Sequence, residues 1–119
     1  MNPDDLKKRT KAFGLRIIRL VESLPNSKTA DVISRQLLRS GTSVGANYRA
    51  ACRARSKAEF ISKMGIVEEE ADESIYWMEI LQESEIVRLD QLKELQCEGN
   101  ELLSIIVSSI NTARRNKNK

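Results

Sequence analysis

Apolar side chains recur along this chain at the three- and four-residue spacing of amphipathic helices, in four successive segments. The segments cover residues 4–24, 27–55, 57–85 and 90–113. Only a few residues separate one segment from the next, and such short connections force consecutive helices to lie antiparallel. The pattern therefore predicts an all-α fold over residues 1–119, an antiparallel up-down-up-down four-helix bundle in one domain.

Each predicted helix has one apolar face, and the four faces together predict the core. The predicted core residues are, in chain order, Leu6, Phe13, Ile17, Leu20 and Leu24; Ala30, Ile33, Leu37, Val44, Tyr48 and Ala51; Phe60, Met64, Val67, Ala71, Ile75, Met78 and Leu81; and Leu92, Leu95, Leu102, Leu103, Ile106 and Ile110. The aromatic and methionine residues of the third segment belong to this core and not to a cofactor site.

Capping residues mark where the predicted helices begin. Pro3 suits a first helical turn, where its fixed φ costs nothing. Ser27 and Asp90 are expected to cap the second and fourth helices with their side-chain oxygens. Ser56 and Glu59 match a capping box, in which each side chain satisfies an exposed amide near the other residue. The break between the second and third helices is therefore placed at Ser56.

Two glycines and three apolar residues do not fit a simple core stripe. Gly41 and Gly45 lie one turn apart, so they occupy one side of the second helix and permit another backbone to approach closely. Ile66, Trp77 and Ile80 lie beside the main stripe of the third helix. They indicate either a broad core stripe or an oligomer contact, because tryptophan is enriched at interfaces. We assign all five residues to a candidate oligomer interface.

The stretch from Gly41 to Asn47 contains neither of the glycine spacings that cradle phosphate groups in nucleotide-binding proteins. It also lies within a helical period. We expect Ser43 and Asn47, which are one turn apart, to make interhelical hydrogen bonds near the two glycines.

The net charge of +3 conceals a strong segregation of charge along the chain. Residues 28–57 carry a net charge of +6, whereas residues 58–87 carry −8. On a helical wheel, five cations of the second helix share an outward arc: Lys28, Arg35, Arg39, Arg49 and Arg53. The third helix has an outward acidic stripe: Glu69, Asp72, Glu73, Glu79 and Glu83. The cationic stripe fits three interpretations: a solvated surface, a phosphate-binding track or a subunit interface that faces acidic residues.

Several classes of protein conflict with the composition. The chain has no histidine, which removes the usual zinc ligand sets and the nucleophile pairs that depend on imidazole. Cys52 and Cys97 have no disulfide or zinc spacing, and we expect both to be small buried apolar residues. We expect no metal, no cofactor and no enzymatic activity. The chain begins without a secretion signal and has no membrane-spanning run, so we expect a cytoplasmic protein and no membrane contact.

The run from Gln36 to Ala50, followed by the run from Arg53 to Phe60, resembles a known family. It is similar to the bacterial four-helix bundle family of 23S rRNA intervening-sequence proteins, related to the accessory variability proteins of diversity-generating retroelements. The family pattern corresponds here to Gln36, Leu37, Arg39, Ser43, Val44, Asn47, Arg53, Ser56, Glu59 and Phe60. Many members have Asn-Ile-Ala-Glu-Gly where this chain has Asn47-Tyr48-Arg49-Ala50-Ala51, so an acidic residue is replaced by a small one.

The resemblance implies a homopentameric, barrel-like assembly of bundles. In the retroelement relatives it implies association with reverse transcriptase and nucleic acid. We therefore expect a non-enzymatic homo-oligomer that contacts the backbone of RNA or DNA through Lys28, Arg35, Arg39, Arg49, Arg53, Arg114 and Arg115. The alternative is a protein-interaction scaffold or adaptor, whose arginine and acidic stripes contact other subunits or a protein partner such as a reverse transcriptase.

Overall fold

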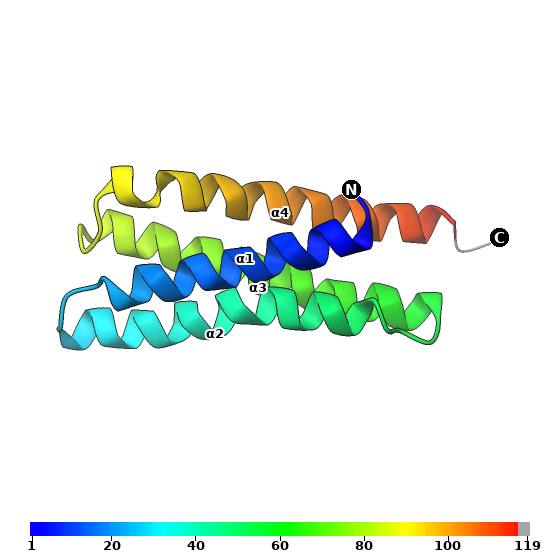
Figure 1. The fold of residues 1–119 in the computed structure, drawn as a ribbon, viewed down its shortest axis with the longest axis horizontal. Helices are drawn as coiled ribbons and strands as arrows, with labels where there is room; N and C mark the ends of the chain where they lie inside the picture. Colours follow the sequence, from blue (N-terminus) through cyan, green and yellow to red (C-terminus); the bar gives the residue numbers. More distant parts are fainter. Residues whose placement is uncertain (117–119) are drawn as a thin grey trace.

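The computed structural model describes residues 1–116 of the chain, and these form four helices joined by short turns (Figure 1). They are α1 (Pro3–Glu22), α2 (Lys28–Ala51), α3 (Lys57–Glu83) and α4 (Leu89–Arg115). Figure 1 shows the helices packed along one another, with the chain reversing direction at each turn. The result is a rod of 52 × 21 × 20 Å. The predicted all-α four-helix fold is confirmed.

The predicted apolar faces do form the core. Nearly all of the predicted positions are buried, including every one assigned to α2. Leu20, Leu24, Phe60 and Leu103 are only partly buried but pack against the same cluster. The period of the apolar residues therefore identified the interior of the bundle, because a stable helix here must bury one continuous stripe.

The second helix ends at Ala51, four residues before its predicted end at residue 55. After Ala51 the chain turns, and the N–H of Arg53 donates to the carbonyl of Ala50 at 3.1 Å. Arg53 therefore lies in the turn and not on the helical wheel of α2, although the turn keeps it next to the end of that helix. The third helix begins at Lys57 as predicted, and the other predicted boundaries differ from the observed ones by one or two residues.

Two of the three predicted side-chain caps are confirmed. The hydroxyl of Ser27 accepts from the N–H of Ala30 at 3.1 Å, and that of Ser56 accepts from the N–H of Glu59 at 3.0 Å. The Glu59 carboxylate accepts from the N–H of Arg55 at 3.2 Å, one residue before the amide of an ideal capping box. The prediction for Asp90 was wrong: α4 begins at Leu89, so Asp90 lies inside the helix, and within residues 1–116 no side chain caps its first turn.

Gly41 and Gly45 hold α1 and α2 close together within one chain. A Cβ placed on Gly41 would lie 2.3 Å from Cδ1 of Ile17, and one on Gly45 would lie 3.3 Å from the backbone of Thr10 and Lys11. The assignment of these two glycines to an oligomer interface was therefore wrong, because α1 of the same chain occupies that side of α2.

The helix α1 approaches α4 less closely than it approaches α2. An ion-pair cluster spans this wider seam. The guanidinium of Arg9 donates from Nε and Nη2 to the two carboxylate oxygens of Glu98, each at 2.7 Å. Its Nη2 also lies 2.8 Å from Oε1 of Glu101. Two parallel bonds to one carboxylate fix the orientation of both groups, so Arg9 ties the first helix to the last.

Acid should weaken this contact between α1 and α4. The hydrogen bond from Arg9 lowers the pKa of Glu98 in the folded protein. Its stabilisation is fully present above the unfolded-state pKa of about 4.3 and is lost as pH falls through the lower folded value. We expect the difference in urea-unfolding free energy between the native protein and Arg9→Met to shrink as pH falls from about 5 to about 3. A difference that stays constant over this range would contradict the assignment.

Candidate anion-binding surface

Five cationic side chains surround an open recess between the beginning of α1 and the end of α2. The recess has a volume of about 480 Å³. Its lining consists of Lys7, Lys8, Lys11, Gly45, Ala46, Arg49 and Arg53. We call it the basic recess. No carboxylate is part of this lining, so the recess has a formal charge of +5.

The register between α1 and α2 brings these charges together. Lys7, Lys8 and Lys11 lie within about one turn of α1, whereas Arg49 lies in the last turn of α2 and Arg53 in the turn that follows it. The close contact of α2 with α1 at Gly45 fixes the register of the two helices, so the lysines and the arginines lie at the same height along the bundle. Small residues between the helices leave the space that the long cationic side chains surround.

None of the five cations forms a salt bridge with any residue of the described range 1–116. By contrast, Arg9, Arg35 and Arg39 are all paired with carboxylates. A helix dipole favours cations near a C-terminus, which applies to Arg49, but it favours acidic groups near the N-terminus of α1. The dipole therefore does not account for the lysines.

A second recess, of about 490 Å³, lies on the side of α2 that faces α3. Arg49 and Arg53 line it as well, so they form a ridge between the two recesses. Its other charged residues are Arg55, Lys63 and Glu59, and this one carboxylate lies 3.9 Å from the Lys63 ammonium. The positive surface therefore continues from α1 across α2 to α3.

The basic end of α4 lies at the same end of the bundle (Figure 1). The Lys57 ammonium at the beginning of α3 donates to the carbonyl of Asn116, which joins the two helix ends. Arg114 and Arg115 are both exposed there. These two predicted residues therefore lie at the same end of the rod as the two recesses.

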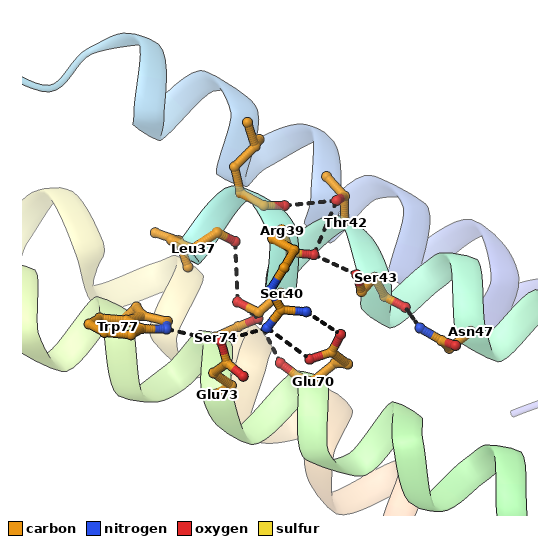
Figure 2. Close-up of polar contacts among 11 residues, drawn as sticks. Leu37, Arg39, Ser40, Thr42, Ser43, Asn47, Glu70, Glu73, Ser74 and Trp77 are labelled. Carbon is orange, nitrogen blue, oxygen red and sulfur yellow. Dashed lines mark hydrogen bonds and ion pairs between the residues drawn. The ribbon is translucent and has the colours of Figure 1, made fainter. Parts of the chain in front are cut away.

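The cations of the predicted stripe on α2 do not act as one group in the structure, because Arg39 is paired with two carboxylates. Its Nη1 donates to Glu70 at 2.8 Å and its Nη2 donates to Glu73 at 2.6 Å, both on α3 (Figure 2). The same Glu73 oxygen accepts from the indole N–H of Trp77 at 3.1 Å. The bond from Arg39, followed by that from Trp77, lowers the pKa of Glu73. Arg39 therefore links α2 to α3 and is not an unpaired cation, and its assignment to nucleic-acid binding stays a prediction.

A buried polar contact lies beneath this network. The hydroxyl of Ser74 donates to that of Ser40 at 3.0 Å, and both residues are fully buried (Figure 2). Ser43 and Asn47 do not form the expected interhelical bonds with any part of the described chain, residues 1–116. Ser43 donates to the carbonyl of Arg39 and Asn47 donates to that of Ser43, so both bonds stay within α2.

Lys28 and Arg35 lie far from the basic recess. Both belong to the first part of α2, and about 20 Å or more of helix separates Arg35 from Arg49 at a rise of about 1.5 Å per residue. Arg35 pairs with Asp31 one turn before it. Of the predicted stripe, only Arg49 and Arg53 contribute to the recess.

The remaining predicted residues are exposed to different degrees. Trp77 and Ile80 are partly buried and pack against the core, whereas Ile66 is 44% exposed. Their role in an oligomer interface stays a prediction. Cys52 is half-buried, but Cys97 is exposed, so the expectation of a buried Cys97 was wrong.

Residues 1–116 contain no cluster of three or more acidic or cysteine side chains that could hold a metal ion. Within the same residues, no helix combines the length and the apolar content needed to cross a membrane.

Comparison with known proteins places this bundle in a family. The family model of the 23S rRNA-intervening sequence protein matches residues 4–108. The chain belongs to this family. The fold is similar to that of a protein of unknown function from the S23 ribosomal protein family of Bacteroides thetaiotaomicron, with a TM-score of 0.86 and 37% sequence identity. The match covers 93% of this chain and 99% of that one. No curated protein matches, and neither finding indicates a catalytic family.

Lys7, Lys8 and Lys11 were not among the cations predicted from the sequence. Their signal was present, since the first 27 residues carry a net charge of +3. The helical wheel of α2 alone could not relate them to Arg49, because that relation depends on how two helices pack.

Proposed function

We propose that this protein is a non-enzymatic nucleic-acid-associated protein that contacts the sugar-phosphate backbone through the basic recess and the cations beside it. The observation that carries the proposal is the set of five unpaired cations between α1 and α2. Unpaired lysines and arginines are available to replace the counterions of phosphate groups. The family takes its name from 23S rRNA, which makes RNA the first ligand to test.

The chemistry of the surface favours backbone contacts over reading of bases. No aromatic side chain lines either recess, so neither has the stacking platform that single-strand binders use. Phosphate contacts position a protein on nucleic acid but carry no sequence information. Binding should therefore depend weakly on sequence and strongly on salt.

A salt series tests the proposal directly. If five cations of the basic recess and of the surface beside it contact phosphates of single-stranded RNA, the slope of log K against log salt should be about −3.5, at roughly −0.7 per contact. Affinity should then fall about 100-fold between 50 and 200 mM salt. Filter binding with two unstructured RNAs of equal length and different sequence measures both the slope and the sequence dependence. An affinity that changes less than about threefold would contradict the proposal.

We also propose that the protein is a homo-oligomer, with the pentamer as the expected form. The support is the family resemblance together with apolar side chains left exposed on the single chain, such as Ile66 and Tyr76, which is 51% exposed. Light scattering at tens of micromolar should give about five times the 13.5 kDa mass of the chain. The mass of a single chain at that concentration would contradict it.

The second candidate function is a scaffold that binds a protein partner, for example a reverse transcriptase, through the acidic stripe. Glu69, Asp72, Glu79 and Glu83 are exposed and form no salt bridge within residues 1–116. Arg39 no longer supports a subunit contact, because it pairs with acidic residues of its own chain. A scaffold would lose its partner on substitution of the acidic stripe and keep it when the recess is neutralised.

A further inference from the structure

The basic recess concentrates charge over a very short length. Its three lysines span about 6 Å of α1, at a rise of about 1.5 Å per residue, and its two arginines lie at the end of α2 and in the turn that follows it. Five positive charges therefore line one recess of about 480 Å³. The second recess, beyond Arg49 and Arg53, includes the carboxylate of Glu59 among its cations. The basic recess has no carboxylate in its lining.

An extended strand of nucleic acid cannot match this charge density. One strand carries about one charge per 3.4 Å along the helix axis, so a length of about 6 Å supplies roughly two. A duplex supplies about twice as many charges, but it presents a broad convex surface to a recess of about 480 Å³. A continuous backbone would leave cations of the recess without phosphate partners.

We propose that the basic recess is a binding site for a compact, multiply charged phosphate group, recognised through its phosphate oxygens and independently of any base. A terminal phosphate carries a charge of about −1.5 to −2 at pH 7, compared with −1 for an internal phosphodiester. A chain of two or three phosphates carries more. Such a group comes from a phosphorylated nucleic-acid end or from a free polyphosphate or nucleotide.

The shape of the recess supports a small ligand. Gly45 and Ala46 are the small residues between the two helices, and the cations approach from both sides. A Cβ on Gly45 would be within 3.3 Å of the α1 backbone, so this part of the recess is narrow and fixed by helix packing. Arginine can bind phosphate oxygens in a bidentate manner, and lysine adds point charges around the same group.

The inference rests on the proposed function, since it uses the same residues. It additionally requires the ligand to be a compact, multiply charged phosphate group. The experiment compares one short RNA carrying a 5′-triphosphate with the same RNA carrying a 5′-hydroxyl, and adds inorganic tripolyphosphate as a third arm measured by calorimetry. At constant salt, we expect the phosphorylated end to bind at least about tenfold more tightly, because it adds charge-assisted hydrogen bonds. Tripolyphosphate should bind with one site per chain and compete with the phosphorylated end.

The matched variants separate a site from a general charge effect. The double variant Lys7→Gln with Lys11→Gln removes two recess charges, and Lys28→Gln with Lys93→Gln removes two exposed charges near the opposite end. Only the first should abolish the preference for the phosphorylated end and the binding of tripolyphosphate. Circular dichroism establishes that both variants are folded.

The outcomes also distinguish this inference from the proposed function. Equal affinity for both RNA ends without tripolyphosphate binding overturns the inference and leaves backbone binding intact. Tripolyphosphate binding in the absence of any RNA binding supports the inference and overturns the proposed function. Equal loss of tripolyphosphate binding in both double variants overturns the inference, because the anion would then respond to net charge alone.

Discussion

Reversing two charges of the basic recess, Lys7→Glu with Lys11→Glu, is expected to weaken RNA binding at 50 mM salt by at least about 100-fold. The change removes two attractive contacts and adds two repulsive ones. At contact distance each charge interaction is worth about 1 kcal/mol even in water, and every 1.4 kcal/mol is a factor of ten. Filter binding gives the affinity. Both lysines have side chains outside the core, so the fold should be retained.

The control for this prediction makes the same change of charge elsewhere. Lys28→Glu with Lys93→Glu alters the net charge equally, and both residues are exposed near the opposite end of the rod. We expect this variant to lose less than about threefold in affinity. Similar losses in the two variants would show that RNA responds to overall charge and would contradict a site between α1 and α2.

Replacing Gly41 with alanine is expected to destabilise the protein by about 1–3 kcal/mol, the usual cost of overpacking a core. The new Cβ would meet Ile17, which is fully buried, at Cδ1, Cγ2 and Cβ, at 2.3, 3.1 and 3.3 Å. Rotation about the Cβ–Cγ1 bond of Ile17 moves Cδ1 and relieves only the first contact, because Cγ2 and Cβ are not moved by it. Urea unfolding followed by circular dichroism measures the change.

Gly65 provides the matched control for Gly41. It also lies within a helix, but a Cβ placed on it meets no atom within 4 Å. Gly65→Ala should therefore stabilise the protein by up to about 1 kcal/mol, through helix propensity alone. If Gly41→Ala also proved stabilising, α1 and α2 would not be packed as closely as described.

The sequence predicted the fold well because each helix carries its own information. The apolar period defines the buried face of a helix, and Ser27 and Ser56 define where two helices begin. The failures on single helices have local causes. Cys97 lies on the outer face of α4, and its expected burial relied on residue type instead of its position in the helical period.

The candidate site was predicted less well because it depends on relations between helices. The wheel of α2 correctly turned Arg39 away from the core, but it could not show that Glu70 and Glu73 of α3 lie opposite. In the same way, the lysines of α1 meet Arg49 only because the contact at Gly45 fixes the register of two helices. A pattern within one segment contains no information on the rotation or register of its neighbour.

The wider seam between α1 and α4 leaves α1 held to the rod chiefly by α2. Since α1 supplies three of the five recess cations, detaching it from α2 would dismantle the recess. A ligand that binds only the assembled form must oppose this opening by mass action. Ligand binding should therefore slow amide hydrogen exchange along the whole of α1, including turns that do not contact the ligand.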